Sequence, residues 1–151
     1  MTASSGYSAE IKPRQGVSRV VPFIRQAPLV MMTLIFSMIS FRYLLNPVRA
    51  AAAAGISFTS PGGVTIARVG FAAFPLSFAI LALSCLISAR RRLPGLYMVL
   101  TVAAVVIAVR VFGIVIDRST ESARLLAPEA VLLILSLIAI RLESARLAAQ
   151  R

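Results

Sequence analysis

Four long stretches of apolar residues place the strongest limit on what this chain can fold into. The clearest of them covers residues 69–89, which are 21 residues without a charge. A helix of that length rises about 32 Å, enough to cross the roughly 30 Å hydrocarbon core of a bilayer. We therefore predict four transmembrane helices, over residues 27–45, 67–89, 93–116 and 125–142.

The overall composition leads to the same prediction. Hydrophobic residues make up 59% of the 151 residues and charged residues 14%, whereas soluble domains average about 45–50% and about 25%. A soluble domain of this size exposes too large a share of its surface to hide so many apolar side chains. The predicted fold class is all-α, an antiparallel bundle of four transmembrane helices within residues 27–142. Residues 1–26 are predicted to form a basic disordered tail, and residues 143–151 a helical tail.

The first connection between the predicted helices is the longest. Asn46-Pro47 ends the first helix, because proline disfavours helical geometry in the residue before it. The alanine run from Ala50 to Ala54 predicts a short helix in the membrane interface, ended by Gly55. Ser60-Pro61-Gly62-Gly63 then predicts a turn before the second transmembrane helix.

The positive charges predict how the bundle is oriented. Short loops rich in Lys and Arg stay in the cytoplasm. Ten positive residues belong to the side of the two termini: Lys12, Arg14, Arg19, Arg25, Arg90, Arg91, Arg92, Arg141, Arg146 and Arg151. Six belong to the opposite side: Arg42, Arg49, Arg68, Arg110, Arg118 and Arg124. We therefore predict that both termini lie in the cytoplasm.

A cleavable signal peptide is the alternative interpretation of the first apolar stretch. Small residues of the kind that signal peptidase cuts follow it at Val48-Arg49-Ala50-Ala51-Ala52. The apolar stretch is longer than the usual 7–15 residues of a signal peptide, which favours a retained helix. Three further transmembrane helices would follow in either case.

The net charge of +11 comes from 16 Lys and Arg against 5 Asp and Glu. These basic residues cluster between apolar runs, without the interleaved aromatic residues that stack on bases, so we predict no nucleic-acid partner. Anionic lipid headgroups at the cytoplasmic face are the predicted partners instead. The chain has no His and one cysteine, Cys85. We therefore predict no cofactor and no metal site.

Ionisable residues at membrane depth are the candidate site. Arg110 lies about 26 Å along the third helix when that helix starts near Leu93, which places it in the leaflet opposite the termini. Residues 130–140 span only about 17 Å, so the fourth helix needs Glu129 for its length. Both residues therefore lie at a similar depth. Because a charge at membrane depth requires a partner or water, we predict that Arg110 and Glu129 form an ion pair.

Two further charged residues are predicted to join this pair. Asp117 shares a helix face with Arg110 and Gly113, because these positions are three and four residues apart. Arg68 begins the second helix on the same side of the membrane. The predicted charge network therefore comprises Arg68, Arg110, Asp117 and Glu129. It serves either to hold the helix ends together, or as a site where Asp117 and Glu129 act as acid and base.

The order of these motifs resembles that of a known family. Asn46-Pro47, an alanine-rich segment, a glycine-containing turn, Arg68, the string Arg110-x-x-Gly113-x-x-x-Asp117 and Glu129 follow one another over about residues 29–142. This arrangement is similar to the small bacterial four-helix membrane proteins called domain of unknown function 4345, which are DoxX-like relatives. The chain departs from them where Val69-Gly70-Phe71 follows Arg68, since members often carry a Gly-Gly pair there. The resemblance implies four helices in the bacterial cytoplasmic membrane and the same four charged positions, but no activity.

Three functions are compatible with these features. The chain is either a non-enzymatic accessory or partner subunit, a small membrane enzyme, or an oligomeric transporter or channel. The enzyme would act on a lipophilic substrate with Asp117 and Glu129 as catalytic candidates. A transporter of four short helices would need to oligomerise to line a pathway. A fold alone does not determine function, so all three interpretations stay open. We favour the non-enzymatic interpretation, with another copy or another membrane protein as partner.

Overall fold

The computed structural model describes residues 15–118 and 121–150, and these residues are almost entirely helical. Three short segments of other helix types lie between the α-helices. The elements in order are α1 (Gln15–Leu45), α2 (Pro47–Ala52), α3 (Pro61–Arg68), the π-helical segment η1 (Val69–Ala73), α4 (Phe74–Ile87), the 3-10 turn η2 (Ala89–Arg91), α5 (Arg92–Asp117), the 3-10 segment η3 (Glu121–Leu125) and α6 (Leu126–Ala148).

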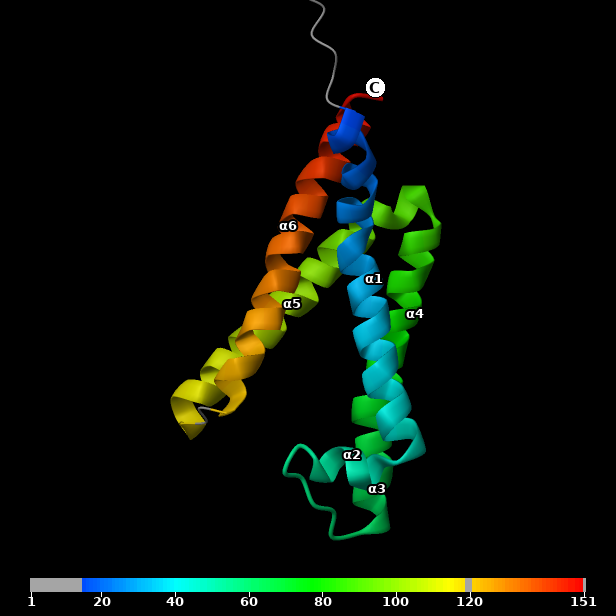
Figure 1. Ribbon diagram of the computed structural model, residues 1–151. Helices are drawn as coiled ribbons and strands as arrows, with labels where there is room; N and C mark the ends of the chain where they lie inside the picture. Colours follow the sequence, from blue (N-terminus) through cyan, green and yellow to red (C-terminus); the bar gives the residue numbers. More distant parts are fainter. Residues whose placement is uncertain (1–14, 119–120, 151) are drawn as a thin grey trace, which may run out of the picture.

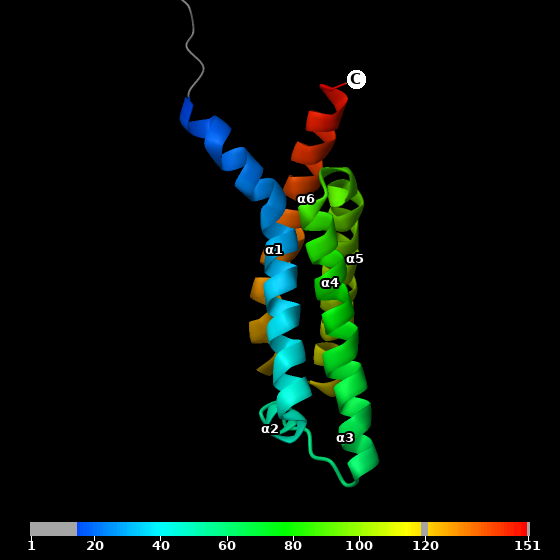
Figure 2. The same ribbon diagram turned by 90° about the vertical axis from the view of Figure 1, so that its right-hand side faces the viewer.

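Four of the helical stretches are long and apolar enough to cross a membrane: Val21–Leu45, Pro61–Ile87, Ala89–Asp117 and Ala123–Ala148. The shortest has 25 residues, which corresponds to about 38 Å of helix against a hydrocarbon core of about 30 Å. Successive stretches run in opposite directions (Figures 1 and 2). The chain is therefore an all-α, antiparallel bundle of four transmembrane helices, as predicted, and fits a multi-pass membrane protein.

The connections divide between two ends of the bundle. The start of α1, the turn η2 and the end of α6 lie at one end, which we call the termini end (Figure 1). The segment α2, the start of α3, the end of α5 and η3 lie at the other, which we call the loop end. Which end faces the cytoplasm stays a prediction.

Several boundaries differ from those predicted. Residues 15–26 belong to α1 rather than to a disordered tail. The predicted helical tail that begins at residue 143 continues α6 without a break as far as Ala148. The two extensions support each other, because Arg25 of α1 contacts Glu143 of α6. The first fourteen residues of the predicted tail lie outside the described residues.

The second transmembrane helix also begins earlier than predicted, at Pro61 instead of residue 67. The Ser60 hydroxyl accepts a hydrogen bond from the Gly63 backbone N–H at 3.2 Å, and Pro61 occupies the first turn. Serine followed by proline is a favourable helix start, since the hydroxyl satisfies a free N–H and proline lacks one. The segment predicted as a turn is therefore the cap of α3.

The buried core lies toward the termini end. It contains side chains from all four transmembrane helices: Leu29 and Met32 of α1, Ala82 of α4, Leu96 and Val99 of α5, and Ala139 and Ile140 of α6. Gly95 permits the closest approach, because a Cβ there would lie 2.5 Å from the Cβ of Cys85 and 3.2 Å from Cδ2 of Leu29. Helices α1, α4 and α5 therefore meet at this glycine.

Replacing Gly95 with alanine is expected to lower the free energy of unfolding by about 1–3 kcal/mol, since the added methyl overpacks the core. Gly70→Ala is the matched control, because a Cβ at Gly70 meets nothing within 4 Å. Reversible unfolding in mixed micelles, followed by circular dichroism, measures both. An equal effect of the two substitutions would contradict the close helix approach at Gly95.

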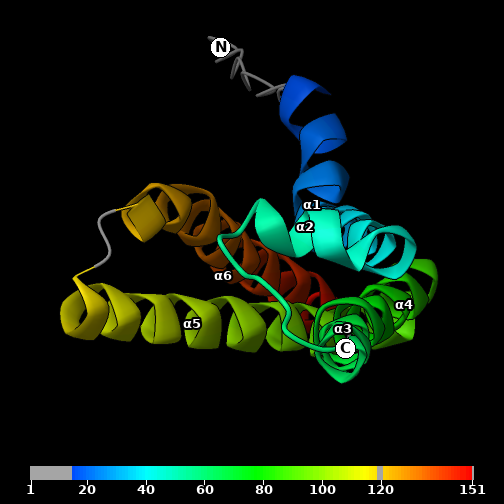
Figure 3. The ribbon, with the colours of Figure 1, turned by 90° about the horizontal axis from the view of Figure 1, so that it is seen from below.

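Toward the loop end the bundle separates into two arms. One arm consists of α1 and α4 with α3, and the other of α5 and α6 (Figures 1 and 3). Aromatic pairs hold α1 on the first arm: Phe36 lies edge to face with Phe78 at 6.2 Å between ring centroids, and Tyr43 packs on Phe71 at 4.9 Å. Such pairs add to the energy of apolar burial. Helix α1 therefore stays beside η1 and α4 in the first arm, while the second arm diverges from it.

Candidate functional site

An ion pair joins the two helices of the second arm. Arg110 Nε donates to both carboxylate oxygens of Glu129, at 2.9 Å to Oε1 and 2.8 Å to Oε2, and Nη2 donates to Oε1 as well. The side chains are only 22% and 17% exposed. Charged hydrogen bonds of this forked kind are the strongest that proteins make. The structure therefore brings together two of the four residues that the sequence suggested.

The local sequence explains why the two residues meet. Arg110 lies seven residues before Asp117, the last residue of α5, and Glu129 lies three residues after Leu126, the first of α6. The short η3 connection makes α5 and α6 antiparallel neighbours. Glu129 also stands in the first turn of α6, where the helix dipole favours a negative charge. The carboxylate is thus held by its own helix as well as by Arg110.

Asp117 and Arg68 are not part of this pair. Asp117 is exposed at the end of α5, and its Oδ2 lies over Gly113 on its own helix. Arg68 ends α3 on the other arm. Within residues 15–118 and 121–150, no ion pair connects either residue to Arg110 or Glu129. The separation of the two arms explains this placement of Arg68.

An apolar cavity of about 410 Å³ adjoins the ion pair. It lies between α1 and the second arm, and its lining includes Ile35, Phe36, Ile39, Val106, Leu125 and Leu132, with Arg110 and Glu129 as its charged residues. This volume is in the range of small-molecule sites, about 300–1,000 Å³. An apolar chain or side chain can therefore reach the guanidinium and the carboxylate from between the arms.

A second charged cluster, which the sequence analysis missed, lies at the termini end. Glu143 of α6 is fully buried. Arg25 Nη1 donates to its Oε2 at 3.2 Å, and Arg146 Nη1 donates to its Oε1 at 2.9 Å. Arg146 is close in sequence, but Arg25 is 118 residues away. The available signal was a single acid among arginines after Glu129, which we assigned to a helical tail beyond the bundle.

In the described part of the chain, no three His, Cys, Asp or Glu residues gather into a group that could hold a metal ion. Comparisons with models of protein families, with curated proteins and with solved structures found no match. The resemblance to the DoxX-like family therefore stays a prediction.

Proposed function

We propose that this multi-pass membrane protein is a non-enzymatic accessory or partner subunit of the bacterial cytoplasmic membrane. Its second arm is a rigid element, locked by the Arg110–Glu129 pair, against which another membrane protein or a second copy of the chain packs. The observation that carries the proposal is the complete engagement of the Glu129 carboxylate. Both of its oxygens accept hydrogen bonds from the Arg110 guanidinium.

The geometry of this pair favours a structural role over acid–base chemistry. A general base must reach the proton that it removes, at roughly 2.6–3.2 Å. Both oxygens of Glu129 already contact Arg110 at such distances. The second candidate carboxylate, Asp117, is exposed at the end of α5. A charged pair between neighbouring transmembrane helices fixes their register, and we assign Arg110–Glu129 that task.

The surface of the second arm supports the association with a partner. Large apolar side chains of α5 are exposed toward the loop end, among them Val109, Phe112 and Val115. Lipid tails cover such a surface as readily as another helix does, so burial of apolar side chains alone does not favour a protein partner over lipid. The cavity between the arms gives this surface a shape, because a side chain of a partner inserted there would contact α1, α5 and α6 together.

Crosslinking in intact cells tests the proposal. A photoreactive phenylalanine analogue at Val106, in the cavity between the arms, is expected to give a discrete protein adduct. The same analogue at Leu81, an exposed apolar position on α4, is the control and should react with lipid only. Cells that express two differently tagged copies distinguish a second copy from another protein. Lipid adducts alone at both positions would contradict the proposal.

The orientation belongs to the same proposal. Ten of the positive residues group with the termini and the turn at Arg90–Arg92, against six with the other side, which supports a cytoplasmic position for both termini. Anionic headgroups of the cytoplasmic leaflet are then the natural contacts of the ten.

The second candidate function is a membrane enzyme for a lipophilic substrate. The cavity of about 410 Å³ beside Glu129 favours it, because a substrate chain could lie there next to a carboxylate. Asp117→Glu and Glu129→Gln separate the two proposals. Loss of a cellular phenotype with normal folding supports the enzyme, whereas loss of folding that Arg110→Gln restores supports the structural pair.

A further inference from the structure

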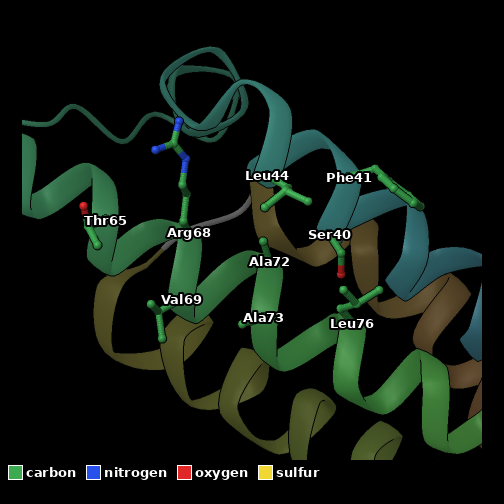
Figure 4. A pocket seen from close by; sticks show the side chains of 9 residues that line it. All are labelled: Ser40, Phe41, Leu44, Thr65, Arg68, Val69, Ala72, Ala73 and Leu76. Carbon is green, nitrogen blue, oxygen red and sulfur yellow. The ribbon is translucent and has the colours of Figure 1, made fainter.

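The first arm carries a separate hollow at the loop end, distinct from the cavity beside Glu129. A cavity of about 270 Å³ lies between the end of α1 and the stretch from α3 to α4 (Figure 4). Phe41 and Leu44 line it from α1, and Ala72, Ala73 and Leu76 line it from η1 and α4. The two small alanines leave the space in which a larger side chain would otherwise fill the interface.

The interior of this cavity offers hydrocarbon alone. Its two hydroxyl groups are already used: Ser40 Oγ donates to the Phe36 carbonyl at 2.6 Å, and Thr65 Oγ1 donates to the Pro61 carbonyl at 3.4 Å. Both bonds stay within the residue's own helix. The inner part of the cavity therefore suits an alkyl chain and does not suit a polar group.

Arg68 lies where the apolar cavity meets the surface of the loop end. It lines this cavity and also a more open hollow of about 560 Å³, formed with Phe58, Ser60 and other residues of the segment before α3. Its guanidinium points away from Leu76 and toward the α2 segment (Figure 4). Leu76 is eight residues further along the helix, about 12 Å deeper in the membrane. The polar and apolar parts of the site thus follow the membrane normal.

The first arm itself carries no acidic residue to compensate its positive charge. Residues 11–116 contain no Asp or Glu, and among the described residues no carboxylate lies within ion-pair distance of Arg68. Arg42 and Arg49 add positive charge at the same end, in a hollow that they share beside α2. A guanidinium is suited to a phosphate because its donors can bind two oxygens at once.

We propose that the first arm binds one anionic glycerophospholipid at Arg68. The phosphate contacts the Arg68 guanidinium at the level of the α3 start, and one acyl chain enters the cavity between α1 and η1. This site lies at the opposite end from the arginines that meet the cytoplasmic headgroups. It is independent of the Arg110–Glu129 pair and of the partner assigned to the second arm.

Native mass spectrometry of the full-length protein tests this site, with phosphatidylglycerol and phosphatidylcholine of equal chain length as the probes. The wild type is expected to retain one phosphatidylglycerol in preference to phosphatidylcholine. Arg68→Gln should weaken phosphatidylglycerol binding about tenfold, because it removes a charged hydrogen bond, and Arg68→Lys should weaken it less. Arg118→Gln removes an exposed charge of the other arm and should leave binding within about twofold.

Two further measurements separate the contribution of the lipid acyl chain from that of the phosphate headgroup. Ala73→Leu fills the cavity from an exposed position, so it should weaken long-chain phosphatidylglycerol and leave a short-chain analogue unaffected. Glycerol phosphate alone should compete poorly, since it lacks the chain. Unchanged phosphatidylglycerol binding by Arg68→Gln that folds normally would overturn the proposal. An equal loss in Arg118→Gln would overturn it too, because the effect would then be general surface charge.

Discussion

Glu129→Gln is expected to lower the free energy of unfolding by about 2–3 kcal/mol, because it leaves the Arg110 guanidinium at membrane depth without a counter-charge. The amide oxygen of the glutamine can still accept hydrogen bonds at the Oε1 position, where two of the three bonds from Arg110 end. The loss is therefore electrostatic more than steric. Unfolding in mixed micelles, followed by circular dichroism, measures it.

Asp117→Asn is the matched control for this prediction. It removes a carboxylate from the same end of the bundle, but that carboxylate is exposed and makes no ion pair among the described residues. Its effect should stay within about 0.5 kcal/mol. Equal effects of Glu129→Gln and Asp117→Asn would mean that the Arg110–Glu129 contact adds nothing to stability.

Glu143→Gln is expected to have an effect at least as large, about 3 kcal/mol. The carboxylate is fully buried and holds two arginines, at 3.2 Å from Arg25 and 2.9 Å from Arg146. Removing one member of a buried charge cluster leaves the others uncompensated. Because Arg25 connects the start of α1 to α6, the start of α1 should also separate from the bundle. Hydrogen exchange of the backbone amides in Val21–Leu45 detects that separation.

Arg146→Gln provides the comparison for Glu143→Gln. Arg146 is 33% exposed and lies three residues from Glu143 on the same helix, so its loss affects no contact between helices. Its effect should be below about 1 kcal/mol. If Arg146→Gln lowered the free energy of unfolding as much as Glu143→Gln does, the contact between Arg25 and Glu143 would not account for the loss of stability.

The four transmembrane helices could be predicted because their signal is local. A long charge-free run specifies a membrane helix whatever its neighbours do. The meeting of Arg110 and Glu129 could also be anticipated, since a short connection and similar depth leave them few other partners. Both inferences depend on distances along a helix, which the sequence contains directly.

The parts that could not be predicted depend on contacts distant in sequence. Arg25 and Glu143 are 118 residues apart, and no periodicity relates them. The start of α1 was therefore predicted too late, and Glu143 was assigned to a tail instead of to the bundle. Arg68 was grouped with Arg110 because both belong to one side of the membrane. The separation of the arms, which places them on different helix pairs, arises from packing at Gly95 and from the aromatic contacts of α1.

A double-mutant cycle on Arg110 and Glu129 tests most directly the claim that this pair is a structural lock. The unfolding free energies of the wild type, Arg110→Gln, Glu129→Gln and the double variant give the coupling between the two side chains. We predict a coupling of at least about 2 kcal/mol, with the double variant more stable than either single one. Additive losses, with a coupling near zero, would contradict the account.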